Sequence, residues 1–239
     1  MSPPGKFSRV PILCYVTDRK GLVAAGNNQS EALLKRIATA AAAGMDWIQI
    51  REKDLSVKEL SSLTRDAVAQ TKQINERNGT LTRIIVNDRV DVAYAEGSGG
   101  VHLGENSLPV EDVRKWLDKK PNPDGAKFLV GVSCHSLKAA MAAARDGADY
   151  IFFGPVFATP SKAAFGAPQG LQQLGEVCSA VAVPVLAIGG ITVDKASDCL
   201  ATGAAGIAAI RLFQETSDQA SLIARFRSTL GGVPHFTSG

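Results

Sequence analysis

The feature that most restricts the fold of this chain is a regular alternation of short apolar runs with longer helical patterns, from about residue 11 to residue 230. Short apolar runs bounded by turn residues predict strands. We expect strands at Ile12–Val16, Trp47–Arg51, Arg83–Asn87, Gly100–Leu103, Phe128–Val132, Tyr150–Phe153, Val183–Ile188 and Gly206–Ile210. Patterns with a period of about 3.6 residues predict helices at Glu31–Ala43, Val57–Arg77, Val90–Ala95, Val110–Leu117, Leu137–Arg145, Leu171–Val181, Val193–Ala201 and Thr216–Leu230.

The predicted strands lack an alternation of polar and apolar residues, which indicates burial on both faces of a parallel sheet. Glycine follows three of the helices, at Gly44, Gly147 and Gly203, where a left-handed residue ends a helix before a tight turn. A length of 239 residues suits one large α/β domain. We therefore expect a single (β/α)8 TIM barrel over residues 11–230, with flexible tails at residues 1–10 and 231–239.

Composition excludes several classes of function. A net charge of +3, without basic runs or interleaved aromatic residues, argues against nucleic acid and suits small anionic ligands. No apolar run reaches the roughly 18 residues of a membrane span and no secretory leader is recognisable, so we expect a cytoplasmic protein. The four cysteines are too widely spaced for a metal or redox motif and should be reduced and buried: Cys14, Cys134, Cys178 and Cys199. The sequence allows a homo-oligomer without specifying one.

Polar residues at the ends of the predicted strands are the candidates for a site, because the active site of such barrels lies at the carboxyl ends of the strands. After the second strand, Gln49, Arg51 and Lys53 are two residues apart and should share one face. Two cations converging on one mouth predict an anionic ligand carrying more than one charge. The alternative is a structural network of ion pairs with Glu52 or Asp54.

The third, fourth and fifth strands end in groups suited to metal binding and proton transfer. Asn87 and Asp88 follow the third strand, where Asp88 fits either a Mg²⁺ ligand or the cap of the next helix, the cap being slightly favoured. Glu105 follows the fourth strand. Ser133 and His135 follow the fifth, and an imidazole there suits acid–base catalysis or a packed structural role.

The last three strands end in groups suited to phosphate. Thr159, Ser161 and Lys162 follow the sixth strand as hydroxyl and ammonium donors, or as an ordinary turn. Gly189 and Gly190 follow the seventh, where glycine lets backbone N–H groups approach a phosphate. The eighth ends in Ile210 and Arg211, and the arginine provides a further phosphate donor.

Seven of these segments together resemble the thiamine phosphate synthase / TenI family in order and position. They are Tyr-Val-Thr-Asp-Arg (15–19), Gln-Ile-Arg-Glu-Lys (49–53), Val-Asn-Asp-Arg-Val-Asp (86–91), Gly-Val-His-Leu-Gly (100–104), Gly-Val-Ser-Cys-His-Ser (131–136), Gly-Pro-Val-Phe-Ala-Thr-Pro-Ser-Lys (154–162) and Ala-Ile-Gly-Gly-Ile (187–191). The resemblance covers nearly all of residues 11–230.

The resemblance implies an enzyme of thiamine biosynthesis that condenses hydroxymethylpyrimidine diphosphate with hydroxyethylthiazole phosphate and releases diphosphate. It implies that Gln49, Arg51 and Lys53 hold the diphosphate, that Asn87 lies on the pyrimidine side, and that Asp88 binds the cofactor Mg²⁺. Ser133 and Lys162 would contact the diphosphate. The thiazole phosphate would be surrounded by Thr159, Ser161, Gly190 and Ile210.

The chain departs from the family pattern at two important positions. Synthases usually carry Gly-Gln-x-Asp after the fourth strand, whereas this chain has Ser107 in place of the metal-binding Asp, which makes Glu105 a substitute candidate. Arg211 stands where a small Ser is usual. These departures favour a TenI-type thiazole tautomerase with His135 as its acid–base group, whereas Lys53 and Asp88 favour the synthase. A phosphate-binding paralogue without catalytic activity is a further alternative.

Overall fold

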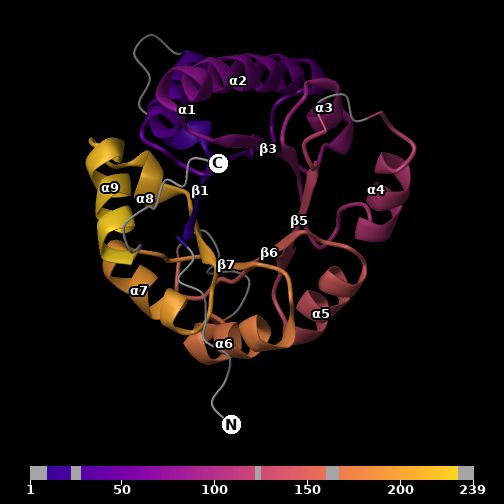
Figure 1. The fold of residues 1–239 in the computed structure, drawn as a ribbon, viewed down its shortest axis with the longest axis vertical. Coiled ribbons are helices and arrows are strands. Elements are labelled where there is room, and N and C mark those ends of the chain that lie inside the picture. The colour runs from indigo at the N-terminus through magenta and orange to yellow at the C-terminus, as the bar shows by residue number, and fades with distance from the viewer. Residues whose placement is uncertain (1–9, 23–27, 122–124, 160–166, 231–239) are drawn as a thin grey trace, which may run out of the picture.

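In the computed structural model, residues 10–22, 28–121, 125–159 and 167–230 are described. Their strands form one closed barrel in which every neighbouring pair is parallel and the strand order follows the chain (Figure 1). The expectation of a (β/α)8 barrel is confirmed. The strands are β1 (Ile12–Val16), β2 (Trp47–Ile50), β3 (Arg83–Asn87), β4 (Gly100–Leu103), β5 (Leu129–Cys134), β6 (Tyr150–Phe153), β7 (Val185–Ile188) and β8 (Gly206–Ala209).

Helices lie outside the ring of strands and surround it (Figure 1). They are η1 (Arg19–Gly21), α1 (Gln29–Ala42), α2 (Val57–Asn78), α3 (Val90–Ala95), α4 (Val110–Leu117), α5 (Leu137–Arg145), α6 (Gly170–Ala180), α7 (Val193–Ala201), α8 (Arg211–Gln214) and α9 (Gln219–Leu230). None of the helices in the described ranges is long and apolar enough to cross a lipid bilayer.

The barrel has two separate apolar cores. The larger lies between the strands and the helices and includes Leu13, Ile48, Ile151 and Ile207, all almost fully buried. The smaller fills the inside of the barrel with Cys14, Val16, Tyr150, Phe152, Leu186 and Ala208. Because side chains alternate along a strand, residues two apart on β1 and β6 share the interior. The interior is therefore packed, and ligands have access only at its ends.

The glycines expected to end helices do so. Gly44, Gly147 and Gly203 have φ angles of 85°, 99° and 101° and lie one residue beyond the caps of α1, α5 and α7. Left-handed backbone costs other residues about 1–2 kcal/mol, which explains the choice of glycine. Each turn returns the chain to the next strand within a few residues.

Several element ends differ from the sequence expectation by one to three residues, each for a local reason. β5 continues to Cys134, because Ser133 and Cys134 pair with Phe152 and Phe153 of β6. β7 begins only after Pro184, which lacks the N–H that a central strand needs. α9 begins at Gln219, because the carboxylate of the preceding residue, Asp218, accepts a hydrogen bond from the backbone N–H of Ser221 at 2.9 Å.

Other sequence expectations are confirmed only in part. Cys14, Cys134 and Cys199 are buried as expected, whereas Cys178 is half-buried. The expected flexible tails lie outside the described residues, apart from Val10. Ser161 and Lys162, both expected in the site, also lie outside the described residues.

Candidate active site

Polar side chains that point into the barrel meet at the carboxyl ends of β2 to β5. Asn87 is the register partner of His102, and Gln49 and Ser133 occupy inward positions on the flanking strands. Two hydrogen bonds cross between these strands: Gln49 Nε2 donates to Asn87 Oδ1 at 2.9 Å, and His102 Nε2 lies 2.9 Å from Ser133 Oγ. One mouth of the barrel is therefore polar, above the apolar interior.

Asp88 is held at this mouth by donors from two strand ends. Its carboxylate accepts from Asn87 Nδ2 at 2.8 Å and from the backbone N–H of Gly104 at 3.3 Å. The hydroxyl of Ser107 also donates to it, and that hydroxyl accepts from Gly104 N at 2.7 Å. Asp88 therefore joins the β3 and β4 ends and places a carboxyl group at the mouth.

The expectation that Asp88 caps the next helix is wrong. The cap position of α3 is Arg89, and no side chain there accepts a helix N–H. Asp88 instead has a φ of 61°, and among the described residues it is the one residue other than glycine with a left-handed backbone. Such backbone is tolerated by Asp better than by most residues and is enriched at functional positions.

The carboxylates beside Arg51 and Lys53 form a network of ion pairs, but with other cations. Buried Glu52 accepts from Thr17 Oγ1 at 2.6 Å and from Arg19 Nη1 at 3.1 Å. Arg19 also holds Asp54 through two bonds, of 2.6 and 2.8 Å, and Lys20 lies 3.1 Å from Asp54. Hydrogen bonding to Asp54 raises the pKa of Arg19. The same contact lowers the pKa of Asp54.

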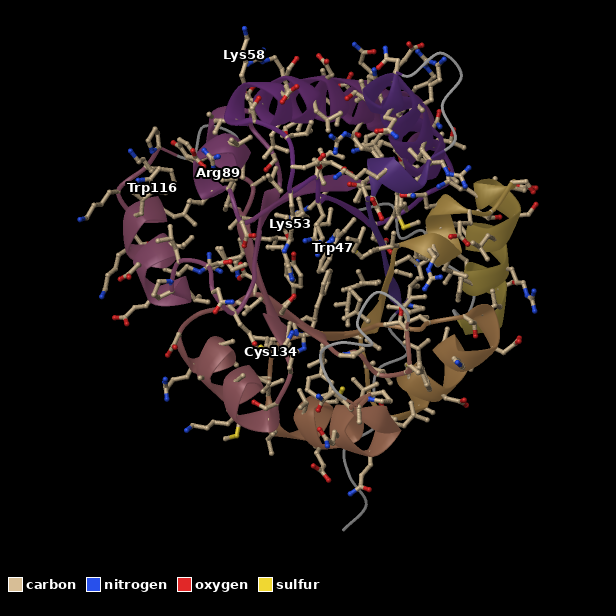
Figure 2. The ribbon with its side chains drawn as sticks, turned by 180° about the vertical axis from the view of Figure 1, so that it is seen from behind. Trp47, Lys53, Lys58, Arg89, Trp116 and Cys134 are labelled. Atoms are coloured by element: carbon tan, nitrogen blue, oxygen red, sulfur yellow. The ribbon has the colours of Figure 1, made fainter. Side chains whose placement is uncertain are left out.

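Arg51 and Lys53 are left available for a ligand. In the described part of the chain, no carboxylate lies within ion-pair distance of either side chain. In the view of Figure 2, Lys53 is seen within the ring of strands, whereas Lys58 projects from the outside of α2. A hollow of ≈ 230 Å³ lies here, lined by Asp18, Lys20, Arg51, Glu52, Lys53 and Asp54. Unpaired cations beside a hollow are suited to binding an anion.

His102 is a site residue to which the sequence patterns assign no role. Its ring is buried between Ser133 and the hydroxyl of Tyr150, which lies 3.1 Å from Nδ1. Burial lowers the pKa of His102 to about 3, against the nearby charge of Asp88, which raises it, and with a smaller lowering by the charge of Arg51. The ring is therefore neutral at pH 7. Its position opposite Asn87 depends on the β3–β4 register, which the sequence does not give.

His135 and Glu105 lie at the β5 and β4 ends but do not join Asp88. His135 is half-buried, and its Nδ1 donates to the carbonyl oxygen of Gly154. Glu105 is exposed, and in the described part of the chain no hydrogen bond links it to Asp88. Burial and, secondly, the charge of Glu105 raise the pKa of the Cys134 thiol to about 12.

The β6, β7 and β8 ends meet at the other side of the mouth. Gly189 and Gly190 have φ angles of 95° and 66°. A Cβ atom on Gly190 would lie 2.6 Å from the carbonyl oxygen of Ala158. Arg211, the first residue of α8, donates to Thr159 Oγ1 at 3.3 Å. The structure thus brings together Thr159, Gly190 and Arg211, three of the residues expected to bind phosphate.

Comparison with known proteins agrees with this geometry. The thiamine monophosphate synthase (TMP-TENI) family pattern matches residues 16–213, most of the chain. The chain belongs to this family. It is 44% identical over 185 residues to thiamine-phosphate synthase of Methanoculleus marisnigri, covering 77% of this chain and 81% of that protein. It is 38% identical over 199 residues to thiamine-phosphate synthase of Roseiflexus castenholzii, covering 83% and 79%.

A solved structure supports membership of the thiamine monophosphate synthase family. Thiamine phosphate pyrophosphorylase from Pyrococcus furiosus superposes with a TM-score of 0.74 at 28% identity. The match covers 94% of this chain and 98% of that one. The similarity therefore extends through the whole barrel, including every strand end that forms the mouth.

The donor set at the mouth fits Mg²⁺ only when the ion is shared with a phosphate ligand. The described residues contain no cluster of three or more His, Cys, Asp or Glu side chains able to hold a metal by themselves. Asp88 provides one carboxylate, and Ser107 places a hydroxyl oxygen against it. Mg²⁺ is commonly bound by one or two carboxylates together with substrate phosphate oxygens, and this family member provides that minimum.

Proposed function

We propose that this chain is a thiamine-phosphate synthase, a transferase that joins hydroxymethylpyrimidine diphosphate to hydroxyethylthiazole phosphate. The observation that carries the proposal is the separation of charge after β2. Glu52 and Asp54 pair with Arg19 and Lys20, so that within the described ranges no carboxylate forms an ion pair with Arg51 or Lys53. The relatives named thiamine-phosphate synthase support the same activity.

The reaction needs a site that stabilises a departing diphosphate. The C–O bond between the pyrimidine methylene and the diphosphate breaks, and its electron pair leaves with the diphosphate oxygen. The thiazole nitrogen then supplies the electron pair of the new C–N bond. Arg51 and Lys53 neutralise the charge that develops on the leaving group, and Ser133 adds a hydroxyl donor. Ser133 Oγ is already hydrogen-bonded to His102 Nε2 before the reaction, so this donor needs little reorganisation at the transition state.

The second substrate is held at the opposite side of the mouth. Arg211 and Thr159 are already hydrogen-bonded to each other beside the Gly190 backbone, so a phosphate there would meet a guanidinium and a hydroxyl. Two anion sites on opposite sides of one mouth place the two rings between them. Such alignment converts a reaction between two molecules into one within a single complex, which is a large source of rate enhancement.

Mg²⁺ is the cofactor that we propose, held by Asp88 together with diphosphate oxygens. When bound, it would neutralise part of the diphosphate charge as a Lewis acid. The chain's own contribution is to fix the Asp88 carboxylate through Asn87, Gly104 and Ser107. Exposed Glu105 is a candidate second carboxylate for the same ion.

The second candidate function is TenI-type thiazole tautomerisation, with His135 moving the proton. One observation favours it: Ser107, which has no charge, engages Asp88 where the family's synthases usually have a second carboxylate. His135 is half-buried near the mouth, with its Nδ1 proton donated to Gly154. Its orientation is therefore fixed, as an acid–base group requires.

One assay separates these functions. Purified protein is incubated with both synthase substrates and Mg²⁺ and, separately, with the thiazole carboxylate phosphate tautomer. Formation of thiamine phosphate, lost in Arg51→Ala and kept in His135→Gln, is the expected result. Isomerisation without condensation, lost in His135→Gln, would establish the tautomerase instead. Binding of the phosphates without either reaction would show a non-catalytic member of the family.

A further inference from the structure

Tyr150, His102 and Ser133 form a hydrogen-bonded line from inside the barrel to the mouth. The hydroxyl of Tyr150 lies 3.1 Å from His102 Nδ1, and His102 Nε2 lies 2.9 Å from Ser133 Oγ. Tyr150 and His102 are 1% and 2% exposed, whereas Ser133 is only half-buried. The line therefore begins in the dry interior and ends at the surface that faces the proposed diphosphate.

The fold makes room for this line at one specific residue. Gly131 is the register partner of both His102 and Tyr150 on the two neighbouring strands. A Cβ atom on Gly131 would lie 2.0 Å from the Cζ atom of Tyr150, so the tyrosine ring crosses the strand where a side chain is missing. His102 is further enclosed by Phe152, whose ring centroid lies 4.2 Å away. These contacts fix both rings.

The direction of each hydrogen bond follows from burial. In the described part of the chain, the Tyr150 hydroxyl has one hydrogen-bond partner, His102 Nδ1. A buried O–H without an acceptor is costly, whereas an unused lone pair on the same oxygen costs little, so Tyr150 donates to Nδ1. In a neutral imidazole one nitrogen accepts and the other carries the proton. The proton is therefore on Nε2, which donates to Ser133 Oγ.

Ser133 gains a defined role from this arrangement. Ser133 Oγ accepts a hydrogen bond from His102. The hydroxyl proton of Ser133 is therefore not used by His102 or Tyr150 and can be donated to another acceptor. In the opposite tautomer, Ser133 would donate to His102 and would present only lone pairs to an anion. We propose that Tyr150 and His102 are positioning residues that hold Ser133 as a hydrogen-bond donor to the diphosphate. This rests on the proposed function of the mouth as a diphosphate site.

The tautomer is measured first, by nitrogen NMR of the ligand-free protein labelled with ¹⁵N-histidine at neutral pH. The chain has three histidines, and the signals of His102 are those lost in His102→Gln. We expect a protonated Nε2 and an unprotonated Nδ1, and we expect this preference to weaken in Tyr150→Phe. A protonated Nδ1 in the unchanged protein would overturn the proposal. This reading does not depend on any catalytic activity.

The consequence for Ser133 is measured with inorganic diphosphate by calorimetry. Tyr150→Phe should weaken binding about fivefold, as expected for one misdirected hydrogen bond. The same change in a Ser133→Ala background should have no further effect, because the line acts through Ser133. Tyr94→Phe is the matched control, since the Tyr94 hydroxyl bonds Pro121 O at 2.8 Å on the outer surface.

Each outcome decides the matter. An equal loss of affinity from Tyr150→Phe with and without Ser133 would show that the tyrosine merely supports the fold, and would overturn the proposal. Unchanged diphosphate affinity in Tyr150→Phe would do the same. If diphosphate binds as expected but no thiamine phosphate forms with the second substrate, the proposed function fails while the positioning role stands.

Discussion

Alternate residues after β2 have different partners. Glu52 and Asp54 face Arg19, whereas Arg51 and Lys53 have no carboxylate partner in the described part of the chain. The period-two spacing predicted that the cations would share a face. It left open whether Glu52 or Asp54 would neutralise them, because the sequence does not show that Arg19 of the first strand end is the partner. The pairing of Glu52 and Asp54 with Arg19 depends on how the ends of β1 and β2 lie beside each other.

At the residue scale, Lys53→Ala should weaken inorganic diphosphate binding about 10- to 100-fold, the loss expected for one hydrogen bond to a charged group. Lys58→Ala is the matched control, because Lys58 is an exposed lysine on the outer side of α2 (Figure 2). Calorimetry with diphosphate measures both. Equal affinity in the two variants would remove Lys53 from the site.

The pH dependence of stability is a second prediction at this scale. Burial lowers the pKa of His102 to about 3, from about 6.5 in the unfolded chain. The unfolded chain therefore binds a proton on this histidine more readily than the folded chain does. The contribution of His102 to the free energy of unfolding is complete above about pH 6.5 and is lost as the pH falls toward about 3. Between these two pH values, the free energy of unfolding changes by up to about 1.4 kcal/mol per pH unit because of this histidine.

Urea unfolding of the unchanged protein and of His102→Gln between about pH 7 and pH 4 measures this effect. The carboxylates remain in both proteins, so the difference between the two slopes isolates the histidine. We expect the variant to lose less stability on acidification. Identical slopes would mean that His102 is protonated as easily in the folded chain as in the unfolded one.

At the scale of elements, the β7 loop is shaped by contact with the β6 loop. Val156 N donates to Ile188 O at 2.9 Å, and Phe157 N donates to Gly189 O at 3.0 Å. The sequence pointed to the paired glycines as a phosphate loop. The structure adds that Gly190 has no space for a side chain beside Ala158, a contact between two loops far apart in the sequence.

Gly190→Ala should therefore lose more unfolding free energy than the positive φ angle of Gly190 alone would explain. Gly44→Ala is the control, because Gly44 also has a positive φ but has nothing within 4 Å of an added Cβ. We expect Gly44→Ala to lose about 1–2 kcal/mol of unfolding free energy without effect on ligands. Gly190→Ala should lose more and should also raise the KM for the thiazole phosphate. If the two variants lose equal stability and keep equal KM, the close contact of the two loops is not needed.

Short elements and their ends were the least predictable part of the fold. α8 spans only Arg211–Gln214, which is too short for a periodic pattern. Its position is fixed instead by long-range contacts: Gln214 accepts from the Tyr15 hydroxyl at 2.9 Å and donates to Asp18 O at 2.7 Å. Arg211 was thus predicted as a site residue without its helix. The longer helices and most strands could be predicted from periodicity and apolar runs, because their burial pattern is local.

At the scale of the whole molecule, the order of strand ends around one mouth could be predicted once the barrel was inferred. What could not be predicted is how neighbouring ends bond to one another. Asp88 was expected more as a cap than as the acceptor for Asn87, Gly104 and Ser107, since those bonds depend on the β3–β4 register. His102 was missed for the same reason.

Ligand binding should stabilise the whole barrel, and metal alone should not. Because the described residues contain no cluster of three or more His, Cys, Asp or Glu side chains able to hold a metal, we expect Mg²⁺ alone to leave the Tm unchanged. Diphosphate at about 100 times its Kd should raise the Tm by roughly 5–10 °C, and Mg²⁺ should increase this further. In a thermal shift experiment, Asp88→Asn should keep the rise in Tm caused by diphosphate and lose only the additional rise caused by Mg²⁺. A large shift with Mg²⁺ alone would indicate a preformed metal site.

The central claim is that the strand ends hold two anionic groups at opposite sides of one mouth. A crystal structure with thiamine phosphate, inorganic diphosphate and Mg²⁺ tests it most directly. The account predicts diphosphate against Arg51, Lys53 and Ser133, and the thiamine phosphate ester against Gly190 and Arg211. Both anions on the same side, or diphosphate bound away from Arg51 and Lys53, would contradict it.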